Sequence, residues 1–215
     1  MRVEAVTAKD ADAIIDMLKK SFFVLEPLNS SIGLVSADGG CPELEEYCRV
    51  VVPTGFSLCA RDESDGGMEG VVLNAILTPA DSPAPETARV RDGDTKFDKI
   101  LAVNHAVELA HDVFAAHPDV QEALDVKILA TDPDRGKKGV ASELMRHTVE
   151  LARARGLRLV RCVCSGAYSA RVVERLGFSK LGGLPYDEFL GLDGQPVFRP
   201  PPPHLAITMW ALRLS

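Results

Sequence analysis

A glycine- and lysine-rich loop stands between a predicted strand and a predicted helix at residues 126–142. Its glycines allow the backbone to approach a ligand closely, and the first amides of a helix have no intrahelical acceptors. With the positive end of the helix dipole, these amides form an anion site suited to a pyrophosphate group. Arg135, Lys137 and Lys138 would add positive charge around it. A basic turn before a surface helix is the alternative interpretation of this stretch.

Other phosphate-binding and catalytic motifs fit the chain less well. The loop has no Gly-Lys-Ser/Thr at the spacing of a Walker loop, and its glycines lack the GxGxxG pattern of dinucleotide-binding folds. The five cysteines form no CxxC pair and no Cys/His metal spacing, so we expect reduced thiols and no bound metal. Cys162 and Cys164 are disfavoured as nucleophiles because both lie in an apolar predicted strand.

The elements around the loop follow an α/β pattern. Strands are predicted at residues 2–6, 56–61, 69–77, 125–130, 157–163, 180–184 and 206–212. Helices are predicted at residues 8–22, 42–52, 99–116, 139–155 and 169–176, and a loop at 30–40. Because Pro27 disfavours helical backbone at the residue before it, the first helical stretch should end by Glu26. We predict one domain spanning residues 1–215.

Composition narrows the class of partner. The net charge is −7 with a pI near 5.3, so no excess positive field is available for nucleic acid or an anionic membrane. The negative net charge mildly favours cationic substrates. No apolar run approaches membrane-spanning length, and the N-terminus lacks the apolar core of a signal peptide. We therefore expect a cytoplasmic protein, and a monomer in preference to an oligomer.

Residues 135–142 resemble the acetyl-CoA motif of the GNAT superfamily of acetyltransferases, usually Arg/Gln-x-x-Gly-x-Gly/Ala. Gly139 and Ala141 match its last two conserved positions. Gly136 stands at the place of the first Arg/Gln, and Lys137 replaces the usual glycine after it. Because backbone amides supply much of the pyrophosphate binding, the resemblance still implies acetyl-CoA as the co-substrate.

A second segment, residues 172–178, resembles the superfamily's Leu-Tyr-Glu-Lys-Leu-Gly-Phe ending. Val173 stands where a tyrosine often acts as the acid, and valine transfers no proton. Gly166 stands where an asparagine is common. These two departures remove the superfamily's usual mechanism and point to a subfamily.

Three further segments resemble the insect arylalkylamine N-acetyltransferases, the group that includes dopamine N-acetyltransferase. Residues 22–29 are similar to their Glu-Pro-Leu segment, residues 165–172 to their two-serine segment, and residues 196–204 to their Pro-Val-Phe…Pro-Pro-His segment. Each match is modest, but their order and spacing make the set specific. The resemblance runs from near residue 20 to the C-terminus. It implies a GNAT-like mixed, twisted sheet flanked by helices and splayed so that the CoA arm enters between two strands.

The resemblance also implies roles for single residues. Glu26, in an apolar corner of the chain, would take the proton from an amine, and partial burial there would raise its pKa. Ser165 and Ser169 would act on the cofactor side, with Tyr168 as an alternative acid. An exposed loop glutamate and a helix-capping serine are the alternatives for Glu26 and Ser169. The expected substrate contacts are Phe23, Pro27, Tyr168 and His204.

The cofactor site is expected to combine the loop with the end of the preceding strand. Backbone N–H groups at that strand's edge would stabilise the negative charge that develops on the thioester oxygen. The residues expected to bind acetyl-CoA are Leu129, Ala130, Thr131, Arg135, Gly136, Lys137, Lys138, Gly139, Val140, Ala141 and Ser142.

The sequence therefore predicts an enzyme that transfers an acetyl group from acetyl-CoA to a small arylalkylamine such as dopamine, serotonin, tyramine or tryptamine. Both substrates would be bound together, because the chain offers no credible acyl-accepting nucleophile. One alternative is a GNAT enzyme acting on a non-aromatic amine such as agmatine or a polyamine, or on a protein N-terminus. Another is a catalytically silent acyl-CoA sensor, which the missing tyrosine favours.

Overall fold

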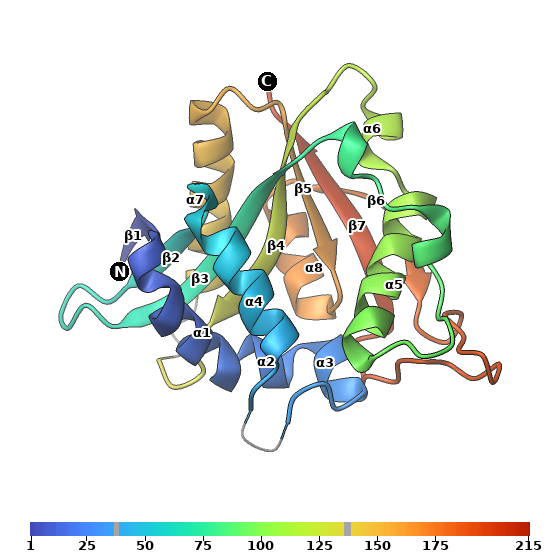
Figure 1. Cartoon of the computed structure of the whole chain (residues 1–215). Coiled ribbons are helices and arrows are strands. Elements are labelled where there is room, and N and C mark those ends of the chain that lie inside the picture. The colour runs from blue at the N-terminus through green and yellow to red at the C-terminus, as the bar shows by residue number, and fades with distance from the viewer. Residues whose placement is uncertain (37–38, 136–138) are drawn as a thin grey trace.

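A single mixed sheet forms the centre of the structure, a computed structural model that describes residues 1–36, 39–135 and 139–215 (Figure 1). The described residues contribute seven strands in the order β1-β2-β3-β4-β5-β7-β6. The strands are β1 Arg2–Ala5, β2 Leu58–Arg61, β3 Met68–Leu77, β4 Ala123–Thr131, β5 Leu159–Cys164, β6 Ser179–Pro185 and β7 Ala206–Arg213. β4 and β5 run parallel, whereas the other neighbours are antiparallel. The predicted mixed sheet is confirmed.

Helices cover both faces of this sheet. The helices are α1 Ala11–Lys20, α2 Phe22–Leu25, α3 Pro27–Ser31, α4 Pro42–Val51, α5 Lys96–Ala110, α6 Val113–Ala116, α7 Val140–Ala154 and α8 Ala167–Arg175. Val71 and Val72 are successive residues of β3, so their side chains point to opposite faces. Val71 packs in the cluster of α1 and α4, and Val72 in the cluster of α7 and α8. The two helix layers therefore lie on opposite sides of the sheet, as Figure 1 shows.

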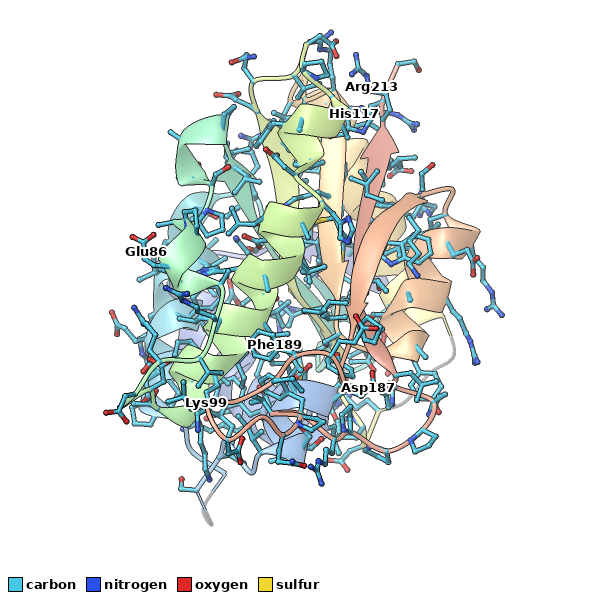
Figure 2. All side chains as sticks on the ribbon, turned by 90° about the vertical axis from the view of Figure 1, so that its right-hand side faces the viewer. Glu86, Lys99, His117, Asp187, Phe189 and Arg213 are labelled. Carbon is cyan, nitrogen blue, oxygen red and sulfur yellow. The ribbon has the colours of Figure 1, made fainter. Side chains whose placement is uncertain are left out.

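A third cluster lies under α5. It joins Val103 and Val107 of that helix to Ile207 and Met209 of β7. The connection between β6 and β7 crosses the end of the sheet beside α5, and its Phe189 belongs to the same cluster (Figure 2). This connection brings residues far apart in the sequence to the end of the sheet where α2 and α3 lie.

The parallel strands β4 and β5 separate partway along their length. Their pairing runs only from Leu124↔Val160 to Val126↔Cys162, although β4 continues to Thr131 beside β3. The register between β3 and β4 shifts at this point, and Lys127 is left without an opposing residue. Such a bulge bends a strand and increases its twist. Within the described residues, the edge of β4 beyond Val126 thus has no β5 partner, and the expected splay is confirmed.

Two predicted helices are interrupted. The predicted helix at 8–22 is a 3-10 turn at Ala8–Asp10 followed by α1, and it breaks at Ser21, whose hydroxyl donates to the carbonyl of Met17. The predicted helix at 99–116 begins earlier, where Thr95 and Asp98 form a capping box. It divides into α5 and α6 because Asp112 caps a new helix by accepting from the N–H of Phe114 at 2.8 Å.

The predicted loop at 30–40 is also wrong at its start. Pro27 opens the short helix α3, which continues to Ser31. Proline is favoured at the first position of a helix, so the same residue that ends one helical stretch begins another.

A buried ion cluster joins β4 and β5 just before they separate. Asp125 lies opposite Arg161 in the register and accepts from its guanidinium at 2.8 Å. Glu108 of α5 accepts from the same guanidinium at 2.9 Å, and the ammonium of Lys127 lies 2.5 Å from Asp125. Burial alone would raise the pKa of Asp125, but Arg161 and Lys127 together lower it to about 2. Both charges of the central pair are therefore retained inside the protein.

None of the helices among the described residues has the combined length and apolar character that crossing a membrane requires.

Candidate active site

Glu26 lies at the junction between α2 and α3, at the end of the sheet where β4 and β5 separate. It has extended backbone (φ −64°, ψ 134°), as the following proline requires, and it caps α3. Its Oε2 accepts from the N–H of Asn29 at 2.7 Å. Its Oε1 is buried and has no hydrogen-bond partner among the described residues. Only 8 % of the residue is exposed, so the sequence alternative of an exposed loop glutamate is excluded.

The environment of Glu26 favours its protonated form. Burial raises the pKa of this carboxyl, and the side chain of Ser165 together with the N–H groups of Asn29 and Leu28 only partly oppose that rise. A buried oxygen without a partner is uncommon in native proteins and calls for an explanation. A carboxyl of raised pKa with one free oxygen is suited to accept a proton from a bound group near neutral pH.

Ser165 follows directly after β5, and its segment is held by a residue that follows β6. The hydroxyl of Tyr186 donates to the carbonyl of Ser165. Tyr186 is 3 % exposed and follows β6. The sequence interpretation missed Tyr186, because its partner lies 21 positions away and depends on how β5 and β6 flank β7. Its position two residues after the strand predicted at 180–184 was the only local signal.

Gly166 explains one departure from the superfamily pattern. A Cβ at this position would lie 2.9 Å from Nδ1 of His204 and 3.1 Å from Cγ of Pro27, so only glycine fits without movement. The N–H of Ala167 donates to the same Nδ1 at 3.2 Å. The ring of Tyr168, which is 61 % exposed, packs edge-on against His204 at 5.2 Å between centroids. Three of the four residues expected to contact substrate, namely Pro27, Tyr168 and His204, are thus brought together.

Ser169, expected to take part in the chemistry, and Phe23, the fourth expected substrate contact, both have evident structural contacts. The hydroxyl of Ser169 donates to the carbonyl of Gly166 at 3.0 Å, in the first turn of α8. The N-cap of α8 is Gly166 and the helix has no side-chain cap hydrogen bond, so the helix-capping alternative for Ser169 is wrong. Phe23 is fully buried in the cluster beneath α1 and α4. Roles for Ser169 in chemistry and for Phe23 in substrate contact stay predictions.

The expected cofactor segment begins on the free edge of β4. Leu129, Ala130 and Thr131 lie on β4 beyond its last pairing with β5. Gly139 precedes α7 with φ +100°, a left-handed conformation that favours glycine, and its carbonyl accepts the N–H of Glu143. Three further residues expected to bind the cofactor lie in the first turn of α7, namely Val140, Ala141 and Ser142. Gly136, Lys137 and Lys138 lie outside the described residues.

Arg135 is engaged by a different part of the chain. Its guanidinium donates to Asp65 at 2.9 and 3.1 Å, across the loop between β2 and β3. It also lies flat over Gly67, where a Cβ would come within 2.3 Å of the guanidinium carbon. Its direct contact with a cofactor phosphate stays a prediction, since that contact would compete with Asp65.

Comparison with known proteins decides the family. Residues 114–178 match the acetyltransferase (GNAT) family. Over 100% of its length the chain is similar to arylalkylamine N-acetyltransferase 2 from Aedes aegypti, with 30% identity, 99% of that chain covered and a TM-score of 0.89. The chain belongs to the GNAT acetyltransferase family. It is an acyl-CoA-dependent N-acetyltransferase, as the loop at 126–142 indicated.

A second relative of this acetyltransferase has a different acceptor. The polyamine N-acetyltransferase of Drosophila melanogaster, which catalyses the formation of N-acetylagmatine, is 29% identical, with 99% of each chain covered and a TM-score of 0.84. Family membership therefore leaves open whether the acceptor is an arylalkylamine or an aliphatic amine.

The acetyltransferase has the features that acetyl-CoA, the family's co-substrate, requires. The free edge of β4 leaves backbone groups beyond Val126 without strand partners on that side. The first amides of α7 lie next to the glycine that starts the helix and are suited to an anion. The residues present thus fit the cofactor, which supplies an acetyl group activated as a thioester.

Acetyl-CoA should raise the melting temperature of the acetyltransferase. A ligand bound only to the native state stabilises it by about 2.7 kcal/mol at a hundredfold excess over its Kd. For a chain of this length that corresponds to about 5–10 °C in Tm. A thermal melt with and without millimolar acetyl-CoA measures the shift, with sodium acetate as the control. An unchanged Tm would contradict the cofactor site.

Proposed function

We propose that this acetyltransferase transfers the acetyl group of acetyl-CoA to the primary amine of a small arylalkylamine of the dopamine, serotonin, tyramine and tryptamine class. Transfer would occur by direct attack with both substrates bound. The observation that carries the proposal is Glu26, a buried carboxyl with a partnerless oxygen among the described residues, in a stretch of chain that also holds the buried Phe23 and Leu28. The similarity to the mosquito arylalkylamine enzyme supports the same acceptor class.

Glu26 would act as the general base. A primary amine is mostly protonated at neutral pH and must lose a proton before it can attack. The free Oε1 of Glu26 can take that proton, and its raised pKa brings the carboxylate closer to the working pH. Ser165 lies beside this carboxyl and influences its pKa, so its hydroxyl can take part in proton movement there.

The side chains next to these groups favour an aromatic amine over an aliphatic amine that carries a second cation. Leu25 adjoins Glu26 in the chain, Leu205 adjoins His204, and Tyr168 packs on His204. All three are large, apolar and more than half exposed, at 64%, 69% and 61%. Exposed large apolar side chains next to candidate site residues support a binding surface for an apolar group. An aryl ring gains contact area from them, whereas the second cation of agmatine gains none.

The acceptor class can be decided by measuring thiol release from acetyl-CoA across a panel of amines. We expect kcat/KM for dopamine, tyramine, serotonin and tryptamine to exceed that for agmatine and spermidine by about tenfold or more, the effect of about 1.4 kcal/mol. A faster reaction with agmatine would contradict the proposal and would indicate an aliphatic acceptor, as in the Drosophila relative. Stabilisation by acetyl-CoA without turnover of any amine, or of a peptide N-terminus, would instead indicate a silent sensor.

A further inference from the structure

Tyr186 connects the segment of Ser165 with the segments of Phe198 and Leu205. Its hydroxyl donates to the carbonyl of Ser165, and its N–H donates to the carbonyl of Leu205 at 3.1 Å. Its ring packs against Phe198 at 6.3 Å between centroids. Only 3 % of the residue is exposed. One side chain therefore ties the end of β5 to the segment that carries His204.

We infer that Tyr186 is a positioning residue, which holds the Ser165 segment in place so that the serine side chain faces Glu26. The role of Glu26 itself rests on the function proposed above. Tyr186 contacts neither amine nor cofactor in this assignment and acts only through Ser165.

The segment is fixed after Ser165, where Gly166 accepts from the hydroxyl of Ser169 and the N–H of Ala170, but Ser165 itself lies between that turn and the last strand pair. The pairing of β5 with β7 ends at Cys164↔Thr208, and the hydroxyl of Thr208 donates to the carbonyl of Cys164 at 3.2 Å. On the other side β4 has already separated from β5. The helix α8 starts only at Ala167. The carbonyl of Ser165 therefore depends on Tyr186, and without that donor the segment would have to move to recover a hydrogen bond.

The Ser165 segment lies against the residue that follows Glu26, because a Cβ on Gly166 would come within 3.1 Å of Cγ of Pro27. Burial raises the pKa of the Tyr186 hydroxyl, and the negative charges of Glu26 and Cys164, when present, raise it further. Tyr186 is thus always protonated in the working range and acts only as a donor. This fits a positioning role and not a role as an acid.

Other charged groups around α2 are engaged elsewhere. Lys127 of β4 is paired with Asp125, and Lys19 and Lys20 at the end of α1 are paired with Glu45 and Asp132. His204 packs on Gly166, which also lies against Pro27, and its Nδ1 accepts the N–H of Ala167. The groups that lower the pKa of Glu26 are therefore Ser165 and the N–H groups of α3, and a substitution of Tyr186 should act on that pKa through them.

The test is a double-mutant cycle read by the titration of Glu26. The variants are Tyr186→Phe, Ser165→Ala and the two combined, with Tyr47→Phe as a control at a partly buried tyrosine of α4. The carboxyl carbon of Glu26 is followed by NMR as a function of pH, which needs no turnover. Because Ser165 lowers the pKa of Glu26, its loss or displacement should raise that pKa.

We expect the Glu26 titration to move to higher pH in Tyr186→Phe and in Ser165→Ala, and the double variant to match Ser165→Ala alone. In turnover, kcat should fall about tenfold in Tyr186→Phe with KM for acetyl-CoA unchanged, and the acid limb should move to higher pH. Tyr47→Phe should leave all three readouts at wild type. If the wild type is inactive with every amine, the proposed function is contradicted. The Glu26 titration would still test the positioning role, because it needs no turnover.

Three results would overturn the positioning role. The first is an unchanged Glu26 titration in Tyr186→Phe. The second is an additive shift in the double variant, which would mean that Tyr186 acts on Glu26 independently of Ser165. The third is a loss of the folded state in Tyr186→Phe, seen as a collapsed thermal melt, which would make Tyr186 a core residue.

Discussion

Replacing Glu26 with glutamine is expected to lower kcat about a hundredfold or more while acetyl-CoA binds as in the wild type. The substitution removes the proton acceptor and little else. Glutamine keeps the length and shape of the side chain, and its carbonyl oxygen can accept the N–H of Asn29 that Oε2 now accepts at 2.7 Å. The cap of α3 is therefore retained. Steady-state kinetics with one aromatic amine and a thermal shift with acetyl-CoA measure the two quantities.

The pH profile should separate a lost base from a damaged site. The base must be ionised to take a proton, so the rate falls as pH drops through the raised pKa of Glu26. In Glu26→Gln this acid limb should flatten. The amine's own ionisation contributes to the same limb, and a second amine of lower pKa should therefore be measured beside the first.

Stability should change in the direction opposite to activity. Because burial raises the pKa of Glu26, its ionised form is disfavoured in the native state, and this penalty is present above the unfolded pKa. Glutamine removes the charge, so Tm at neutral pH should be equal to or higher than that of the wild type. A loss of activity without a loss of stability is typical of a site residue.

Glu122→Gln, at an exposed position, is the matched control and should leave kinetics and Tm unchanged. Wild-type kcat and an identical acid limb with both amines in Glu26→Gln would show that Glu26 is not the base. In that case Ser165, Tyr168 or a water chain would have to be tested in its place.

The features that the sequence predicted well are encoded by neighbouring residues. The strand predicted at 125–130 and the helix predicted at 139–155 correspond to β4 and α7 within two residues at each end. Glycine at position 139 indicated the turn between them, and Gly139 has positive φ. Pro27 likewise indicated the kink at Glu26 through a steric rule that involves only adjacent residues.

The features that the sequence did not predict depend on contacts across the fold. Tyr186 reaches Ser165 only because β6 and β5 both flank β7. Arg135 pairs with Asp65, 70 positions away, and this pairing gave no local signal. Gly166 departs from the superfamily pattern, and the close packing of His204 against it accounts for the glycine. Such residues cannot be assigned from spacing alone, because their partners are set by strand order.

The ion cluster at the point of splay was also absent from the sequence interpretation, and it should control stability strongly. Removing one partner of a buried ion pair leaves an uncompensated charge and costs about 3–5 kcal/mol. We expect Asp125→Ala to lose that amount of unfolding free energy in urea, because Arg161 is only 4 % exposed and would keep just Glu108 as a carboxylate partner. Asp119→Ala, which breaks the exposed pair with Arg213, is the control and should lose far less.

The acid dependence of stability gives a second signature of the same cluster. The folded pKa of Asp125 is lowered from 3.8 to about 2, so its contribution is present above the unfolded value and is lost as pH falls through the folded one. The wild type should therefore lose unfolding free energy between about pH 4 and pH 2 in a component that Asp125→Ala lacks. Combining Asp125→Leu with Arg161→Met should recover much of the stability, since removing both charges leaves neither uncompensated. If Asp125→Ala and Asp119→Ala prove equally mild, the charges at the splay do not hold β4 to β5, and strand pairing and apolar packing alone must hold them.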